Sequence, residues 1–117
     1  MKKQYKHTIA IDVDGVLADF EGEFCDRFGA ENRHNSNLHA RYPDIDPDII
    51  NEFVASPDTY ANSYPIFGGI HLCNKARELG FYILLITSRP KTTAEVTRRW
   101  LEGYEVPYND LIYYSKY

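Results

Sequence analysis

The sequence predicts an α/β domain built on a parallel sheet, because strand-length apolar runs alternate with helical patterns along the chain. Three runs have the length and composition of strands: residues 8–13, 81–86 and 111–114. The run at 81–86 is apolar without alternation, which is typical of a parallel strand covered on both faces. Since parallel strands are joined by right-handed crossovers, we expect a three-layer Rossmann-like sheet with helices on both faces.

The first strand is followed by a segment with helical patterns. Phenylalanines four residues apart predict a helix over residues 20–28, which Gly29 ends. The polar stretch at 30–42 predicts a loop. An Asp-Pro-Asp sequence at 46–48 combines an N-cap with a first-turn proline, and it predicts a short helix that ends or bends at 56–58.

Two further helices are expected between the strands. Gly68 and Gly69 are expected to break the chain, and the apolar positions after them predict an amphipathic helix over residues 70–79. A second helix is predicted over residues 93–101. The order of elements therefore places a small helical cap, at about 20–66, after the first strand of the sheet.

Length and composition indicate one globular domain over residues 1–117, with 44% hydrophobic residues. No apolar run reaches the length of a membrane span, and aspartates interrupt the run after the basic N-terminus, so we expect a cytoplasmic protein with no membrane partner. The net charge of −4 argues against binding to duplex nucleic acid. Cys25 and Cys73 match no zinc spacing, and we expect both to be reduced.

The first strand ends in two carboxylates, Asp12 and Asp14, and Gly15 then allows the chain to turn. Two carboxylates so close together repel each other, and each is costly to remove from water, so a cation is expected to compensate them. A hard cation such as Mg²⁺ prefers these oxygen ligands. A Ca²⁺ loop of the EF-hand type is the alternative, but Leu17 and Phe20 do not fit its ligand positions.

Polar residues also follow the other two strands, and ligands of parallel sheets bind at the carboxyl ends of the strands. Thr87 and Ser88, with Arg89 behind them, follow the second strand. Ser115 and Lys116 follow the third. Hydroxyls and an ammonium beside a metal-binding carboxylate pair predict a site for a phosphate group.

The motifs at these strand ends resemble those of the haloacid-dehalogenase-like (HAD-like) phosphohydrolases. The resemblance rests on Asp-Val-Asp-Gly-Val at 12–16, on Ile-Thr-Ser-Arg-Pro at 86–90 and on Lys116. The longer sequence Asp-Val-Asp-Gly-Val-Leu-Ala-Asp-Phe at 12–20 is most similar to the small 5′(3′)-deoxyribonucleotidases and their phage and bacterial relatives. The resemblance extends over almost the whole chain.

This resemblance implies a Mg²⁺-dependent phosphatase that acts on a small phosphorylated metabolite or nucleotide. Asp12 would be the nucleophile and Asp14 the general acid and base, and both would bind Mg²⁺. The implied roles of the remaining site residues are binding and charge stabilisation of the phosphoryl group: Thr87 and Lys116 in catalysis, and Gly15, Ser88 and Arg89 in phosphate binding. For Lys116, a solvated tail is the alternative reading.

The chain also departs from the family pattern, because it lacks a fourth, acidic motif after a further strand. Asp19, Glu21, Glu23 or a partner chain could supply the missing carboxylate, and the sequence leaves this open. A sheet shortened at the C-terminus would leave residues 9–13 as an exposed edge, and we expect a homo-oligomer to cover it. The five tyrosines after residue 103 would form core, a base-stacking surface or an interface.

Two alternatives to an active phosphohydrolase follow from the missing motif. The chain could be a HAD-like protein that binds a nucleotide or phosphorylated ligand with little or no turnover. It could also be the amino-terminal part of a longer enzyme.

Overall fold

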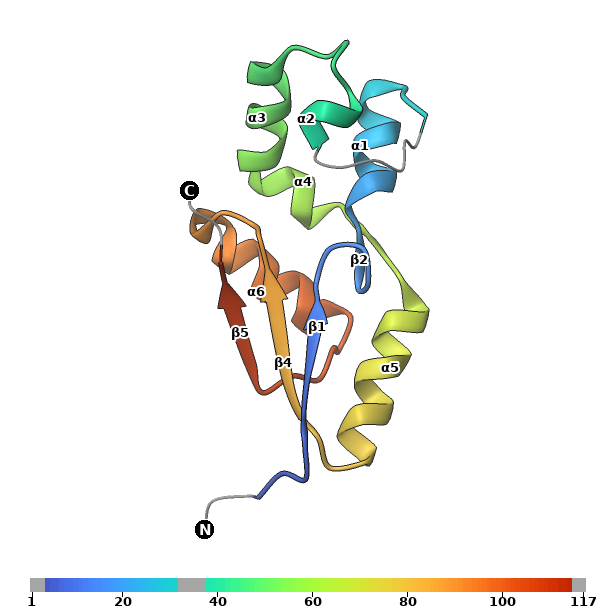
Figure 1. Ribbon diagram of the computed structural model, residues 1–117, viewed down its shortest axis with the longest axis vertical. Coiled ribbons are helices and arrows are strands. Elements are labelled where there is room, and N and C mark those ends of the chain that lie inside the picture. The colour runs from blue at the N-terminus through green and yellow to red at the C-terminus, as the bar shows by residue number, and fades with distance from the viewer. Residues whose placement is uncertain (1–3, 32–37, 115–117) are drawn as a thin grey trace.

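The computed structural model describes residues 4–31 and 38–114 and contains a three-stranded parallel sheet. Its strands are β1 (Thr8–Asp12), β4 (Tyr82–Thr87) and β5 (Asp110–Tyr113), in the order β1-β4-β5 (Figure 1). The predicted α/β class and the three predicted strands are confirmed. β1 has β4 on one side and is an edge strand within the described residues.

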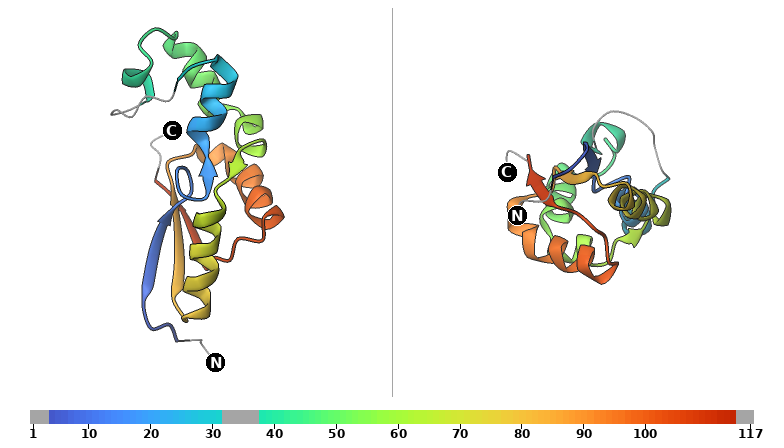
Figure 2. Two further views of the ribbon diagram at one scale, coloured as in Figure 1. Left: turned by 90° about the vertical axis from the view of Figure 1, so that its right-hand side faces the viewer. Right: turned by 90° about the horizontal axis from the view of Figure 1, so that it is seen from below.

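Both connecting helices pack on the same face of this sheet (Figure 2). They are α5 (Phe67–Glu78) and α6 (Ala94–Gly103), the latter preceded by a 3-10 turn, η1 (Lys91–Thr93). Residues of both helices join Ile11, Ile83 and Leu85 in one hydrophobic core. Two right-handed crossovers that advance in the same direction across a sheet place both helices on one side. The described part of the chain therefore has two layers rather than the three expected, and one sheet face is open.

Four helices form a separate body at the carboxyl end of the sheet (Figure 1). These are α1 (Phe20–Phe28), α2 (Leu38–Arg41), α3 (Pro47–Ala55) and α4 (Pro57–Ala61). They lie between β2 (Ala18–Asp19) and β3 (Tyr64–Pro65), which pair as an antiparallel ribbon. A second hydrophobic cluster, centred on Phe24, holds α1, α2 and α3 together. The molecule is accordingly elongated, with extents of 53 × 25 × 25 Å.

Local signals predicted α1 and α3 correctly. The Asp19 carboxylate accepts a hydrogen bond from the Gly22 amide at the start of α1, and Gly29 ends that helix in the left-handed conformation, with φ of 59°. Asp46 caps α3 in the same way, and Pro47 occupies its first turn. These capping residues define helix ends through short-range contacts, so the sequence is sufficient to predict them.

Two of the predicted helix boundaries and loops were wrong. The predicted loop at 30–42 contains α2. The predicted end of α3 at 56–58 is confirmed, since this helix stops at Ala55, and a further short helix, α4, follows it with Pro57 in its first turn. Gly68 and Gly69 do not break the chain, because α5 begins before them. A side chain at Gly69 would overlap the carbonyl oxygen of Val16, so this glycine is explained by close packing against the loop after β1.

A hydrogen bond connects α6 to the segment that returns from the cap. The indole nitrogen of Trp100 on α6 donates to the carbonyl oxygen of Ser63 at 2.9 Å. Trp100 itself is buried. Among the described residues, no helix has the length and apolar composition needed to cross a membrane.

Candidate functional site

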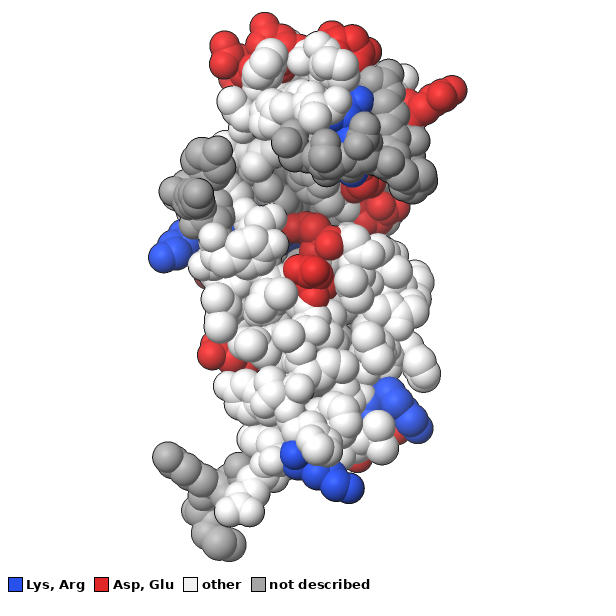
Figure 3. Space-filling model, viewed as in Figure 1, with Lys and Arg blue, Asp and Glu red and all other residues white. Residues whose placement is uncertain are grey.

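The two aspartates of the first motif lie where the sheet meets the helical cap. Asp12 is the last residue of β1 and is exposed, and Asp14 lies in the loop that follows and is half-buried. Figure 3 shows acidic side chains gathered at this level of the molecule. The position agrees with the general rule that ligands of parallel sheets bind at the carboxyl ends of strands.

The loop after β1 is a tight turn that reverses the chain beside Asp14. Gly15 has φ of 89°, a conformation that favours glycine. Its amide donates to the carbonyl oxygen of Ala18 at 2.8 Å, and the amide of Leu17 donates to that of Val13 at 2.8 Å. These bonds fix the backbone of the first motif, and they explain why a glycine follows the second aspartate.

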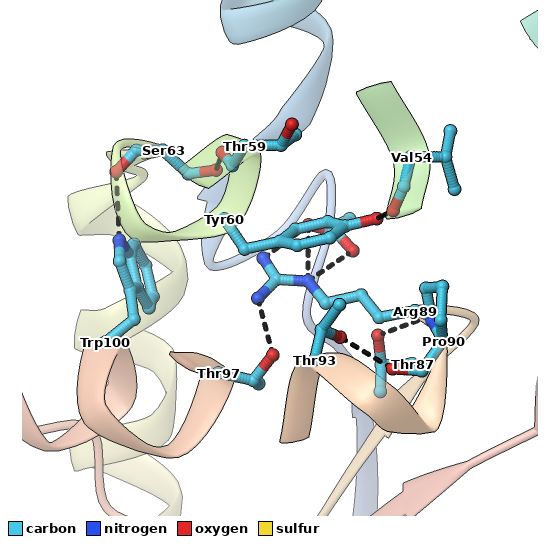
Figure 4. Close-up of polar contacts among 11 residues, drawn as sticks. Val54, Thr59, Tyr60, Ser63, Thr87, Arg89, Pro90, Thr93, Thr97 and Trp100 are labelled. Carbon is cyan, nitrogen blue, oxygen red and sulfur yellow. Dashed lines mark hydrogen bonds and ion pairs between the residues drawn. The ribbon is translucent and has the colours of Figure 1, made fainter. Parts of the chain in front are cut away.

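Arg89 binds the side chain of Asp14 directly. Its guanidinium is buried and binds the carboxylate with two nitrogens: Nη2 donates to Oδ1 at 2.7 Å and Nε donates to Oδ2 at 3.0 Å. The remaining nitrogen, Nη1, donates to the hydroxyl of Thr97 on α6 at 3.0 Å (Figure 4). A two-pronged ion pair of this kind holds a carboxylate in one orientation.

Tyr60 covers the other side of the Arg89 guanidinium. The guanidinium carbon lies 4.3 Å from the centre of the Tyr60 ring, in the geometry of a cation–π contact (Figure 4). The Tyr60 hydroxyl donates to the carbonyl oxygen of Val54 at 2.6 Å. Burial, with a smaller contribution from the charge of Asp14, raises the pKa of Tyr60 above its ordinary value, so this hydroxyl stays a donor. Tyr60 thereby connects the cap to Asp14 through Arg89.

The residues of the second motif are divided between the interior and the surface. Thr87 is buried, and its hydroxyl oxygen accepts a hydrogen bond from the Arg89 amide at 3.1 Å. Ser88 is exposed. The turn continues with Thr93, whose hydroxyl donates to the carbonyl oxygen of Pro90 at 2.6 Å. Lys116 and Ser115, predicted to complete the site, lie outside the described residues.

A cavity of about 270 Å³ lies between the cap and these residues. Asp14, Ser88 and Arg89 line it from the sheet side, and the cap contributes one or more residues from each of its four helices. The cap residues that line the cavity are Phe20, Leu38, Arg41, Val54 and Tyr60. Since four of the five cap residues are apolar or aromatic, whereas the three residues on the sheet side are polar or charged, the cavity suits a ligand with one anionic end and one apolar end.

The acidic residues considered for a third metal ligand are engaged elsewhere. Asp19 caps α1, Glu21 forms an ion pair with Arg41, and Glu23 lies 3.9 Å from Arg27. The described ranges, 4–31 and 38–114, contain no group of three metal-binding side chains. Asp110 is the first residue of β5, and the register places it beside Leu84 in the middle of β4. The expectation that it lies at the opposite end of the sheet is wrong, because β5 begins only partway along β4.

Tyr60 and Thr97, which both contact Arg89, were not predicted from the sequence. Neither belongs to a motif, and each reaches Arg89 only through the packing of the cap and of α6. A weak signal existed for Thr97, because it lies within the helix predicted over residues 93–101, three residues before Trp100. No comparable signal in the sequence points to Tyr60.

Comparisons with known proteins show a similarity of fold alone. No family model matches the sequence, and a search of curated proteins finds no match. A chain from a Pnkp1/Rnl/Hen1 complex is 18% identical with a TM-score of 0.60, and the match covers 97% of this chain and 30% of that chain. A chain from a Pnkp1/Rnl/Hen1 RNA repair complex is 18% identical with a TM-score of 0.58, covering 94% of this chain and 26% of that one. The present chain therefore spans less than a third of the chains it resembles.

Proposed function

We propose that this protein is a Mg²⁺-dependent phosphohydrolase of the HAD-like type, acting on a small phosphate monoester. The observation that supports this most is the place of Asp12 and Asp14 at the carboxyl end of β1, with Asp14 lining a cavity between the sheet and the cap. Asp12 is exposed, whereas Asp14 is held by Arg89. This difference suits Asp12 as a free nucleophile and Asp14 as an oriented acid.

In the proposed reaction, a carboxylate oxygen of Asp12 attacks the phosphorus atom, and the bond between phosphorus and the leaving oxygen breaks. Asp14 donates its proton to that oxygen. Water then attacks the phosphorus of the aspartyl-phosphate and gives a proton back to Asp14, while the bond between Asp12 and phosphorus breaks. Inorganic phosphate is released, and both aspartates return to their starting states.

The residues present fit a Mg²⁺ ion. This ion binds proteins through one or two carboxylates and completes its shell with waters and phosphate oxygens, so a third carboxylate is not obligatory. Asp12 would hold it through its exposed carboxylate, and Asp14 through its main-chain carbonyl, because Arg89 occupies the Asp14 side chain. Bound Mg²⁺ would neutralise the charge of the phosphoryl oxygens.

The second motif and the cap would bind the two ends of the substrate. The Ser88 hydroxyl and the main chain at Gly15 are positioned at the surface beside Asp14, where a phosphoryl group would lie. Thr87 and Lys116 are proposed to assist there. The cap side of the cavity, with Phe20 at one wall, would take the apolar part of the substrate, for which a nucleoside is the leading candidate.

An assay of phosphate release tests this proposal. The purified protein is incubated with an aryl phosphate and with nucleoside monophosphates, with and without Mg²⁺. We expect Mg²⁺-dependent release that falls at least about 1,000-fold in Asp12→Asn, since the nucleophile is lost. Asp110→Asn is the matched control, because it removes an exposed carboxylate at the amino end of β5, which is separated from β1 by β4. Equal rates in the two variants would contradict the proposal.

Binding without turnover is a second candidate, and one observation favours it. Both carboxylate oxygens of Asp14 are engaged by Arg89, so a proton on Asp14 requires one of these hydrogen bonds to break. Calorimetric titration with nucleoside monophosphates and Mg²⁺ separates the two candidates. Saturable binding with no phosphate release supports the binding protein, whereas release above the Asp12→Asn level supports the enzyme.

A further inference from the structure

The guanidinium of Arg89 is held by three separate elements. Asp14, in the loop after β1, accepts hydrogen bonds from Nε and Nη2. The hydroxyl of Thr97 on α6 accepts one from Nη1 at 3.0 Å, and the ring of Tyr60 on α4 lies over the guanidinium carbon (Figure 4). Two of these three contacts do not involve Asp14, so they fix the position of the guanidinium independently of the carboxylate.

The burial of Arg89 favours an action on Asp14 over direct binding of the phosphoryl group. Its side chain is 1% exposed, and each of its three nitrogens donates to a protein oxygen. To reach a phosphate, the guanidinium would have to move away from Asp14 and Thr97. A half-buried carboxylate would then lose its charged partner, which is costly.

The contacts with Thr97 and Tyr60 matter most when Asp14 carries a proton. Protonation of one carboxylate oxygen breaks one of the two bonds from Arg89 and leaves the other. A guanidinium bound by Asp14 alone would then be free to turn. Because Thr97 and Tyr60 keep it in place, the remaining bond still holds the carboxyl group in one orientation. A general acid needs such a fixed geometry, since its proton must reach the leaving oxygen.

We propose that Arg89, Thr97 and Tyr60 are positioning residues that together hold Asp14 as the acid for an alkoxide leaving group. This inference rests on the proposed function, because it assigns these residues a role within that reaction. As the bond from Asp12 to phosphorus forms, the bond from phosphorus to the alkoxide oxygen breaks, and the proton of Asp14 passes to that oxygen. The substrate class that needs such an acid is an alkyl phosphate, for example a sugar with a phosphorylated hydroxyl.

Two substrates of similar size test this role, because they differ in their need for an acid. Benzyl phosphate releases an alkoxide, whereas para-nitrophenyl phosphate releases a stable phenolate. The quantity compared is kcat/KM, which covers the steps up to departure of the leaving group and excludes hydrolysis of the aspartyl-phosphate. Loss of acid positioning should lower kcat/KM for benzyl phosphate and leave the value for para-nitrophenyl phosphate nearly unchanged.

Thr97→Val tests the contact that lies farthest from the substrate. Thr97 is buried and is not among the residues that line the cavity, so its hydroxyl acts on the site through Arg89. We expect kcat/KM for benzyl phosphate to fall at least about fivefold, which is part of the roughly 100-fold or more that a general acid supplies. Thr93→Val is the matched control, because this buried hydroxyl at the start of the same helix donates to Pro90 instead. It should keep the wild-type ratio of the two kcat/KM values.

Arg89→Lys and Tyr60→Leu test the rest of the arrangement. Lysine keeps the charge of Arg89, but it lacks the planar fork that binds a carboxylate with two nitrogens. Arg89→Lys should lower kcat/KM for benzyl phosphate at least about tenfold more than that for para-nitrophenyl phosphate. Tyr60→Leu removes the ring over the guanidinium and should shift the ratio in the same direction. Circular dichroism establishes which variants are folded, and Thr97→Val decides the matter if Arg89→Lys is not.

The outcomes separate this inference from the proposed function. A wild type that releases phosphate from neither substrate overturns the proposed function, and the role of Arg89 with it. An active wild type whose folded Arg89→Lys variant loses equally on both substrates overturns this inference alone, because loss of a phosphate ligand predicts that result. Likewise, a Thr97→Val protein with the same ratio as Thr93→Val overturns the role of Thr97.

Discussion

Arg89 is a buried cation whose charge is neutralised by one residue far away in sequence. Asp14→Asn removes that charge and leaves the guanidinium uncompensated, which we expect to lower the free energy of unfolding by about 3 kcal/mol, at the low end for a broken buried pair. Asp14 is still 23% exposed, which is why the low end applies. Asp12→Asn, at an exposed position, should change stability by less than about 0.5 kcal/mol. Urea unfolding of both variants checks this, and equal losses would contradict it.

Cys73 is a buried thiol that we expect to be unreactive in the folded protein. Burial raises its pKa to about 11, so the thiol is protonated near neutral pH and becomes a thiolate only as the pH rises toward that value. In a Cys25→Ser background, iodoacetamide at pH 8 should label Cys73 at least about 100-fold more slowly in the native protein than in urea. Similar rates in the two states would show that the thiol is accessible.

The amino end of α5 depends on one of two adjacent glycines. Gly69→Ala would push a methyl group into the carbonyl oxygen of Val16, and we expect it to destabilise the protein by about 2 kcal/mol or more. Gly68→Ala meets no atom within contact distance, and it should be neutral or stabilising by up to about 1 kcal/mol. Thermal unfolding of the pair provides the test, and a Gly69→Ala protein as stable as Gly68→Ala contradicts the packing described for the loop after β1.

Helices with short-range signals could be predicted from the sequence, and helices without them could not. Asp19 and Gly29 delimit α1 through bonds within a few residues, so its bounds follow from the sequence. In contrast, α2 is a single turn of polar sequence that is stabilised where Leu38 packs on the cap core. Such tertiary support leaves no periodic pattern in so short a segment.

Across the whole molecule, the site was predicted in part because topology determines where strand ends lie. Asp12 and Thr87 end adjacent parallel strands, so they meet at one edge of the sheet whatever the details of packing. The contacts of Arg89 could not be predicted, since Tyr60 comes from the cap and Thr97 from α6. The open sheet face was also not predicted. Whether helices cover one face of the sheet or both depends on whether successive strands are added in the same direction, and the sequence does not give the order of the strands.

The most direct test of the proposed reaction is mass analysis of the peptide that contains Asp12. An aryl phosphate has a good leaving group that needs little help from an acid, so Asp14→Asn should still accept the phosphoryl group but lose it slowly to water. The protein is mixed with this substrate and Mg²⁺ at a temperature at which circular dichroism shows it folded, and it is then quenched in acid. We predict that Asp12 carries one phosphoryl group. Phosphate release by the wild type with no phosphoryl group on Asp12 in either protein would contradict the proposal.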